Sequence, residues 1–117
     1  MGLVHVDMRV SIPRRAARIV RFLVDSGAVY SVLPQTVWKG LKLKPQRRLE
    51  FTLADGTTVT RDVSECRFEL GGIGAASPVI LGEERDQALL GVVTLETLGL
   101  VLDPFERKLR PMRMMLA

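Results

Sequence analysis

The sequence predicts an all-β fold in which many short strands close, or nearly close, into a barrel. Three observations support this prediction. Short segments of β-branched and apolar residues recur along the chain, turn residues separate them, and only one C-terminal stretch has clear helical spacing. A length of 117 residues, 47% of them hydrophobic, suits a single domain over residues 1–117. Because only 5% of the residues are aromatic, we expect an aliphatic core.

The first elements are predicted to be strands with one short helical segment after them. Residues 3–10 alternate between apolar and polar side chains, which is typical of a half-buried strand. Residues 19–24 (IVRFLV) follow a charged loop and form a second, more buried strand. We expect the two strands to pair as a hairpin. A short strand at 28–34 then precedes one or two helical turns that end at Gly40.

The middle of the chain contains the strongest turn signal. Asp55-Gly56 lies between two runs rich in strand-forming residues, so it is predicted to form the tip of a hairpin. Further strands are expected within 65–72 and 76–84, with Gly74 at a turn between them.

The C-terminal third changes character. Leu95 and Leu98 have helical spacing, and Gly99 follows them as a helix-ending residue. A strand is expected at 100–103, with a last short strand at 107–109. The sequence therefore predicts one short C-terminal helix between strands.

Charge and composition argue against several classes of protein. The net charge is +4 and the pI is about 9.8, but the basic residues are scattered along the chain rather than clustered, so we expect no nucleic-acid partner. No apolar run approaches the roughly 20 residues that cross a membrane, and the charged, alternating start does not resemble a signal peptide. We therefore expect a cytoplasmic protein with no membrane partner.

The inventory of metal-binding side chains is small. Cys66 is the single cysteine, which excludes an intrachain disulfide. His5 is the single histidine and lies far from Cys66 in the sequence, so we expect no metal site.

An acidic residue interrupts the most apolar part of the chain. Asp25 follows the run IVRFLV, and apolar residues resume at Val29. A carboxylate that loses its water is costly unless it is paired or protonated. Asp25, Ser26 and Gly27 are also common turn residues, so the triplet alone indicates a strand end as readily as a catalytic group.

Four stretches together resemble one protein family. Residues 22–28 read FLVDSGA, 31–34 read SVLP, 89–91 read LLG and 94–104 read TLETLGLVLDP. With these motifs the chain resembles the retropepsin-like aspartic proteases, and most of all their single-domain bacterial and archaeal branch. Members of that branch often carry VDTGA, SVLP and LLG followed by LE, GL and DP. The resemblance covers nearly the whole chain, and the combination of motifs is specific.

The resemblance implies a fold and an activity. The fold would be a retropepsin-like closed β barrel with a flap hairpin and one short C-terminal helix, acting as a two-fold homodimer on a peptide or protein substrate without a cofactor. Two carboxylates that share one proton split into an acid and a base, which lets them activate a water. This chain has one such motif, so Asp25 of each subunit would have to meet at the two-fold axis.

The resemblance also assigns roles to the neighbours of Asp25. The Ser26 hydroxyl is expected to bond across the dimer, and Gly27 to let a backbone amide approach the carboxylate. Ala28 completes this loop. The support beneath the loop is expected from Leu89, Leu90 and Gly91.

The hairpin tip corresponds to the flap that closes over substrate. Its expected residues are Ala54, Asp55, Gly56 and Thr57. An extended peptide would bind through backbone hydrogen bonds and apolar subsites. The residues expected to line or support these subsites are Val24, Ala28, Val29, Val32, Ile80 and Leu81.

The sequence departs from the retroviral pattern at two places. Val92 and Val93 stand where charged residues often support the dimer, and Tyr30 stands where an acid often occurs. Dimerisation would then be weaker, or it would depend on apolar and terminal contacts. A second interpretation is a non-catalytic β-barrel module that binds peptides or mediates assembly, in which Asp25 is kept as a turn residue.

Overall fold

The computed structural model describes residues 3–116, which form nine strands and two short helices. In chain order the elements are β1 (His5–Ser11), β2 (Arg18–Val24), β3 (Ser31–Leu33), α1 (Gln35–Gly40), β4 (Arg47–Thr52), β5 (Thr58–Leu70), β6 (Ile73–Leu81), β7 (Leu89–Leu90), α2 (Val92–Leu98), β8 (Leu100–Asp103) and β9 (Lys108–Pro111). The predicted all-β fold is confirmed, and α1 corresponds to the helical turns expected before Gly40.

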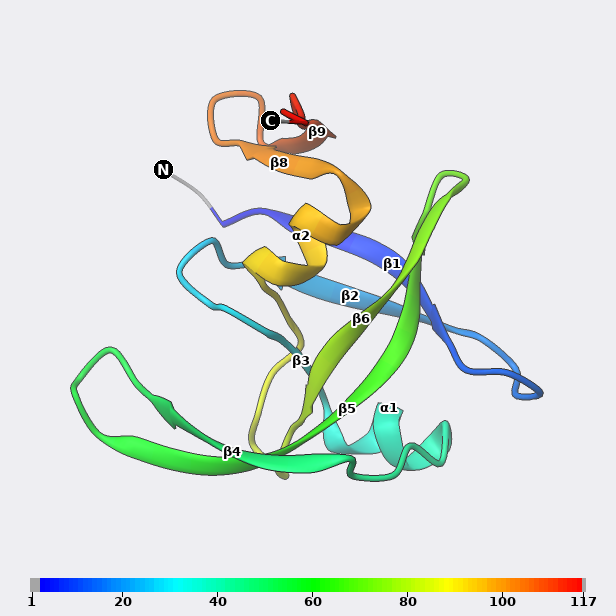
Figure 1. The fold of residues 1–117 in the computed structure, drawn as a ribbon, viewed down its shortest axis with the longest axis vertical. Coiled ribbons are helices and arrows are strands. Elements are labelled where there is room, and N and C mark those ends of the chain that lie inside the picture. Colours follow the sequence, from blue (N-terminus) through cyan, green and yellow to red (C-terminus); the bar gives the residue numbers. More distant parts are fainter. Residues whose placement is uncertain (1–2, 117) are drawn as a thin grey trace.

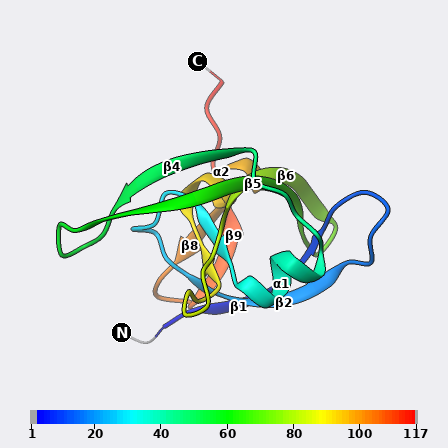
Figure 2. The ribbon, with the colours of Figure 1, turned by 90° about the horizontal axis from the view of Figure 1, so that it is seen from below.

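Seven strands form one sheet that curls into a barrel. Their order is β1-β2-β7-β3-β6-β5-β4, and an additional pairing of β1 with β5 closes the ring. Most neighbours are antiparallel, but β2 pairs with β7 and β3 with β6 in parallel. The strand β4 lies outside the ring, paired only with the first half of β5 (Figure 1). Seen from below, this β4–β5 hairpin extends well beyond the barrel (Figure 2).

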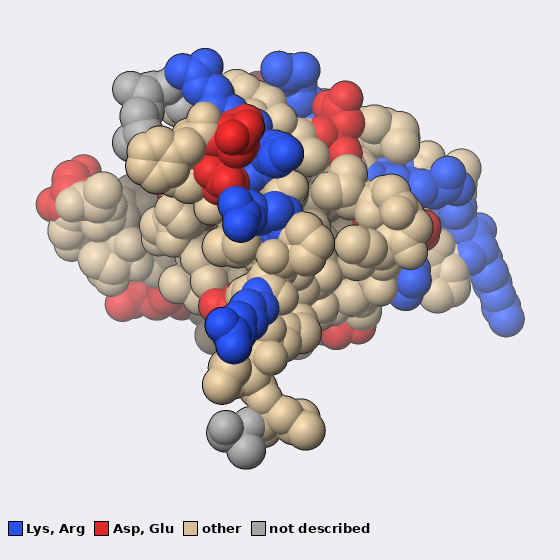
Figure 3. All heavy atoms as spheres, turned by 90° about the horizontal axis from the view of Figure 1, so that it is seen from above, with Lys and Arg blue, Asp and Glu red and all other residues tan. Residues whose placement is uncertain are grey.

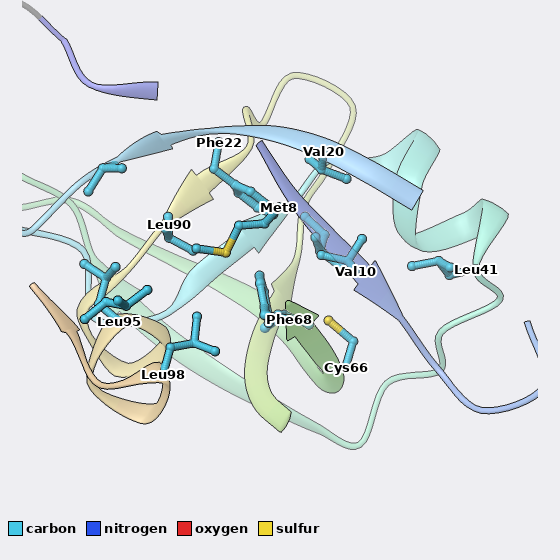
Figure 4. Close-up of a cluster of buried hydrophobic side chains, with 14 of the residues drawn as sticks. Met8, Val10, Val20, Phe22, Leu41, Cys66, Phe68, Leu90, Leu95 and Leu98 are labelled. Atoms are coloured by element: carbon cyan, nitrogen blue, oxygen red, sulfur yellow. The ribbon is translucent and has the colours of Figure 1, made fainter. Parts of the chain in front are cut away.

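The barrel interior is filled mainly by aliphatic side chains. Met8, Val10 and Phe22 come from the β1–β2 hairpin, and Phe68 and Leu90 approach them from β5 and β7 (Figure 4). The rings of Phe22 and Phe68 lie 5.7 Å apart, centroid to centroid. Burying each such side chain contributes roughly 1.5–3 kcal/mol to folding. The expected aliphatic core is confirmed, since Phe22 and Phe68 are the only aromatic residues among the buried core residues described.

Two boundaries differ from those expected from the sequence. The segments on either side of Ser64 form a single strand, β5, because the backbone of residues 63–70 pairs without a break with β6. The buried Ser64 hydroxyl donates to the Lys44 carbonyl at 2.7 Å. The expectation of a turn at Gly74 was wrong, since Gly74 lies inside β6 and pairs with Glu69. Its missing side chain leaves room for the Arg67 guanidinium.

The C-terminal elements cover one end of the barrel. α2 ends as predicted at Gly99, whose φ of 72° is the left-handed conformation that closes many helices. The strands β8 and β9 then pair as a separate two-stranded sheet. On this side, Lys and Arg side chains are interspersed with acidic and uncharged residues (Figure 3). Within residues 3–116, no helix has the length and apolar character needed to span a bilayer.

Candidate active site

Asp25 is the first residue after β2 and begins a tight turn. Its main-chain N–H donates to the Leu90 carbonyl at 3.0 Å, and its own carbonyl accepts from the Ala28 N–H at 3.1 Å. Its side-chain Oδ1 accepts from the Gly27 N–H at 2.9 Å. The residue is half-buried in the single chain. Asp25 thus follows the buried strand instead of lying within it.

The turn around Asp25 leaves space at one critical point. A Cβ atom on Gly27 would lie 3.3 Å from Asp25 Oδ1, which is tighter than most such contacts. Glycine at this position lets its amide approach the Asp25 carboxylate to 2.9 Å. Ser26 is exposed in the single chain, and its expected bond across a dimer remains a prediction.

The second motif lies directly against this loop. β7 pairs in parallel with the end of β2, which places Leu89 beside Leu23 and Leu90 beside Val24. One residue further, a Cβ on Gly91 would lie 2.6 Å from the Tyr30 carbonyl carbon, so no larger residue fits there without a shift. The LLG segment therefore lies directly against the Asp25 loop.

The start of α2 completes the support. The N–H of Val92 donates to the Ala28 carbonyl at 2.9 Å, and the N–H of Val93 donates to the Val29 carbonyl at 3.0 Å. Because the donors are backbone N–H groups, these two hydrogen bonds form with valine at both positions, where retroviral proteins often carry charged residues. The first helical turn is thereby fixed to the loop that follows Asp25.

The predicted flap is the tip of the β4–β5 hairpin. Gly56 has a φ of 88°, and Leu53 and Thr57 close the turn through a 2.7 Å backbone hydrogen bond. Asp55 Oδ1 accepts from both the hydroxyl and the N–H of Thr57, at 2.6 and 2.9 Å, and these bonds hold the pKa of Asp55 below its usual value. Residues 53–57 are all exposed, as expected of a tip that carries no core residue.

A groove of about 660 Å³ lies between the Asp25 loop and the β4–β5 hairpin. Asp25, Gly27 and Ala28 lie on one side of it, and Leu53 and Ala54 on the other. Its volume suits several side chains of an extended peptide. The expected subsite residues that line it are Ala28, Val29, Val32 and Ile80. The other two, Val24 and Leu81, lie in the core and act as support.

The groove also contains a charged pair that sequence analysis did not identify. Arg61 of β5 donates through Nε to Asp86 Oδ2 at 3.0 Å, and Glu50 of β4 lines the same groove. Burial raises the pKa of Asp86, but the Glu83 N–H and the Arg61 guanidinium outweigh burial and lower it overall. Twenty-five residues separate the partners, and no local pattern marks them.

Tyr30 connects the Asp25 loop to the base of the hairpin. Its ring packs edge-on against Phe51 with centroids 6.0 Å apart, and its hydroxyl accepts from Arg47 at 3.0 Å. The position where an acid often occurs in the family is therefore used here for an aromatic contact with β4.

The remaining candidates have structural positions. Cys66 is buried in the core, and burial, with the Glu65 charge, raises the pKa of its thiol to about 12. Trp38 of α1 packs against the core and donates through Nε1 to the Gly82 carbonyl at 2.8 Å. Among residues 3–116, no three His, Cys, Asp or Glu side chains are close enough together to hold a metal ion.

Comparison with known proteins agrees with this geometry. The family model described as gag-polyprotein putative aspartyl protease matches residues 14–97, which include the Asp25 loop, the hairpin and Leu89–Gly91. Because this match covers more than half of the chain, the chain belongs to that family and is an aspartic peptidase. A search of curated proteins finds no match.

Solved structures show the same fold. The protease of equine infectious anaemia virus (EIAV), solved with the inhibitor HBY-793, has a TM-score of 0.64 at 18% identity, over 84% of this chain and 89% of that one. The simian foamy virus protease has a TM-score of 0.54 at 18% identity, over 78% of this chain and 92% of that one. The retropepsin-like fold is thereby confirmed.

Proposed function

We propose that the chain is an aspartic endopeptidase that works as a two-fold homodimer, in which Asp25 of each subunit forms the catalytic dyad. The observation that supports this most is the position of Asp25, which lies half-buried at one side of a 660 Å³ groove with the flap hairpin opposite. Each chain supplies one Asp-Ser-Gly triplet, so a second chain must supply the other carboxylate. We also propose that residues 1–117 form one domain.

The surroundings suit this chemistry. One carboxylate of the pair takes a proton from a water molecule, and the other, protonated, donates to the carbonyl of the scissile peptide bond. In each subunit the Gly27 N–H donates to one oxygen of the Asp25 carboxylate. The hydrogen bond from the Asp25 N–H to the Leu90 carbonyl holds the loop against β7. The apolar residues of the groove, with Arg61 and Asp86 at its polar part, would bind the side chains of an extended peptide.

A second function fits one specific observation. Asp25 Oδ1 accepts from the Gly27 N–H within the same turn, and this role needs no chemistry. A peptide-binding or assembly module would keep Asp25 for that bond alone. The free thiol of Cys66 suits the reducing cytoplasm that we expect for either function.

Replacing Asp25 with Asn distinguishes the two functions. The Asn side-chain oxygen still accepts from the Gly27 N–H, so the turn and the melting temperature should be preserved. Peptide cleavage should fall by roughly 10²–10⁴-fold, because the variant lacks the group that activates water. Asp62→Asn, a change on β5 at a carboxylate that pairs with Arg48 and does not line the groove, is the matched control and should cleave normally. Cleavage by Asp25→Asn at the unchanged rate would show that Asp25 is not the catalytic group, and cleavage by neither protein would leave the binding module as the function.

The dimer is tested separately. Sedimentation of the unmodified chain at increasing concentration should show a monomer–dimer equilibrium, and specific activity should rise with it. Activity should also follow a bell-shaped pH profile whose two apparent pKa values belong to the pair. A chain that stays monomeric while it cleaves peptides would contradict the proposed mechanism.

A further inference from the structure

Three buried hydroxyl groups form a continuous chain of hydrogen bonds beneath the Asp25 loop. Ser31 Oγ of β3 lies 2.6 Å from Thr94 Oγ1 of α2, which lies 2.9 Å from Ser77 Oγ of β6. All three residues are at most 1% exposed. These elements are far apart in the sequence, yet α2 packs against both β3 and β6 (Figure 1).

The direction of every bond in this chain is determined by its two ends. At one end the Gly91 N–H donates to Ser31 Oγ at 2.9 Å, and at the other Ser77 donates to the Pro78 carbonyl at 3.2 Å. Each hydroxyl has only one hydrogen. Since Ser77 uses its hydrogen on Pro78, Thr94 must donate to Ser77, and Ser31 must donate to Thr94. Hydrogen bonds aligned in one direction polarise and strengthen one another.

The chain ends on the peptide unit that supports Asp25. The peptide bond between Leu90 and Gly91 presents two groups in opposite directions. Its carbonyl accepts from the Asp25 N–H at 3.0 Å, and its N–H donates to Ser31 at 2.9 Å. A small rotation of this peptide would move the base of the catalytic turn. The hydroxyl chain restrains that rotation from the side opposite Asp25.

We propose that the hydroxyl chain of Ser31, Thr94 and Ser77 fixes the orientation of the Leu90–Gly91 peptide. Through this peptide it holds Asp25 in the position that the dyad requires. Thr94 is the central positioning residue, because it both donates and accepts within the chain. It does not line the groove. The effect of Thr94 on catalysis rests on the proposed function, but the restraint of the Leu90–Gly91 peptide by the hydroxyl chain does not. Misplacement of a reacting group by about 1 Å can cost on the order of 100-fold in rate.

The first test measures the peptide itself, without any substrate. Hydrogen exchange at the Gly91 amide, followed by NMR, should be about tenfold or more faster in Thr94→Val, which keeps the shape but removes the hydroxyl. Thr94→Ser restores the hydroxyl and should exchange within about threefold of the unmodified protein. The matched control is Ser64→Ala, which removes a buried hydroxyl bonded to Lys44 instead of to this chain, and it should leave Gly91 exchange unchanged.

The second test measures catalysis. Thr94→Val should lower kcat about tenfold or more with KM within about twofold, and should shift the two limbs of the pH profile, since the spacing of the carboxylates sets their coupling. Thr94→Ser should restore both kcat and the pH profile. A purely structural role would lower the melting temperature without changing the pH profile of the folded fraction.

The outcomes are separable. Unchanged Gly91 exchange in Thr94→Val, or equal impairment by Thr94→Ser, would overturn the proposed restraint. If Thr94→Val does not fold, Ser77→Ala removes only the far end of the chain and should still speed Gly91 exchange by about threefold. Unchanged exchange in Ser77→Ala would then overturn the restraint. If the unmodified protein cleaves no peptide, the endopeptidase proposal fails, and exchange alone decides on the restraint.

Discussion

The main-chain N–H of Asp25 donates to the carbonyl oxygen of Leu90 at 3.0 Å. This bond joins two segments more than 60 residues apart, at the point where β2 and β7 run parallel. It explains why a turn that is half-buried in the single chain can hold its carboxylate in a fixed place. The precision of the site therefore depends on the packing of Leu90 and Gly91 as much as on the turn itself.

The close approach at Gly91 predicts a strong effect of one methyl group. In Gly91→Ala the new Cβ would meet backbone atoms of Tyr30 at 2.6–2.7 Å, which must move to make room. We expect a loss of roughly 1–3 kcal/mol in unfolding free energy, measured by urea denaturation, together with loss of cleavage. Gly40→Ala is the matched control, because its Cβ would meet only the flexible end of Arg18. Equal stability of the two variants would contradict this account of the support.

The flap tip predicts an effect on turnover larger than the effect on folding. Gly56 has a φ of 88° with no neighbour near its Cβ position, so Gly56→Val strains only the backbone, by roughly 1–2 kcal/mol. Gly72, with a φ of 87° at the far β5–β6 turn, is a matched control with the same strain. Both variants should lose similar melting temperature, but only Gly56→Val should lose kcat/KM. A similar loss of kcat/KM in Gly72→Val would show that the hairpin tip has no special role.

The sequence was sufficient to predict most of the strands, the barrel and the Asp25 turn, but not the short strand β7. These features depend on local patterns: the strand runs, the Asp55-Gly56 tip and the LLG motif. The exact extent of β5 was missed because the strand continues through Ser64 by pairing with β6, and no local pattern marks that pairing. The Arg61–Asp86 pair was missed for a similar reason, since partners 25 residues apart are brought together only by the folded barrel.

The polar part of the groove predicts a pH dependence of stability. The folded state holds the pKa of Asp86 below its ordinary value of 3.8, so this group stabilises the fold above that value and stops doing so as pH falls through the lowered pKa. Between pH 5 and 2 the melting temperature of Asp86→Asn should therefore fall less than that of the unmodified protein. Asp62→Asn, which removes the more exposed pair with Arg48, should follow the unmodified curve closely. Parallel curves for Asp86→Asn and the unmodified protein would contradict the assignment.

The buried thiol predicts slow labelling and a loss of stability at alkaline pH. Burial raises the pKa of Cys66 from 9.0 to about 12, so the folded protein should resist a thiol reagent at pH 8 that labels the unfolded chain at once. Between these two values the unfolded chain releases the proton and the folded chain keeps it, so stability falls as pH rises from about 9 towards 12. Cys66→Ala should remove this part of the alkaline loss. Rapid labelling of the native protein would contradict the buried position.

Mixing subunits tests most directly whether two Asp25 carboxylates from different chains act together. Unmodified chain and Asp25→Asn are combined at constant total concentration, allowed to exchange subunits, and assayed for peptide cleavage. If the dyad spans a homodimer, only dimers of two unmodified chains cleave, so activity follows the square of the unmodified fraction and an equal mixture retains about one quarter. Activity that falls in direct proportion, with about one half retained in the equal mixture, would show that a single chain carries out the chemistry and would contradict the shared dyad.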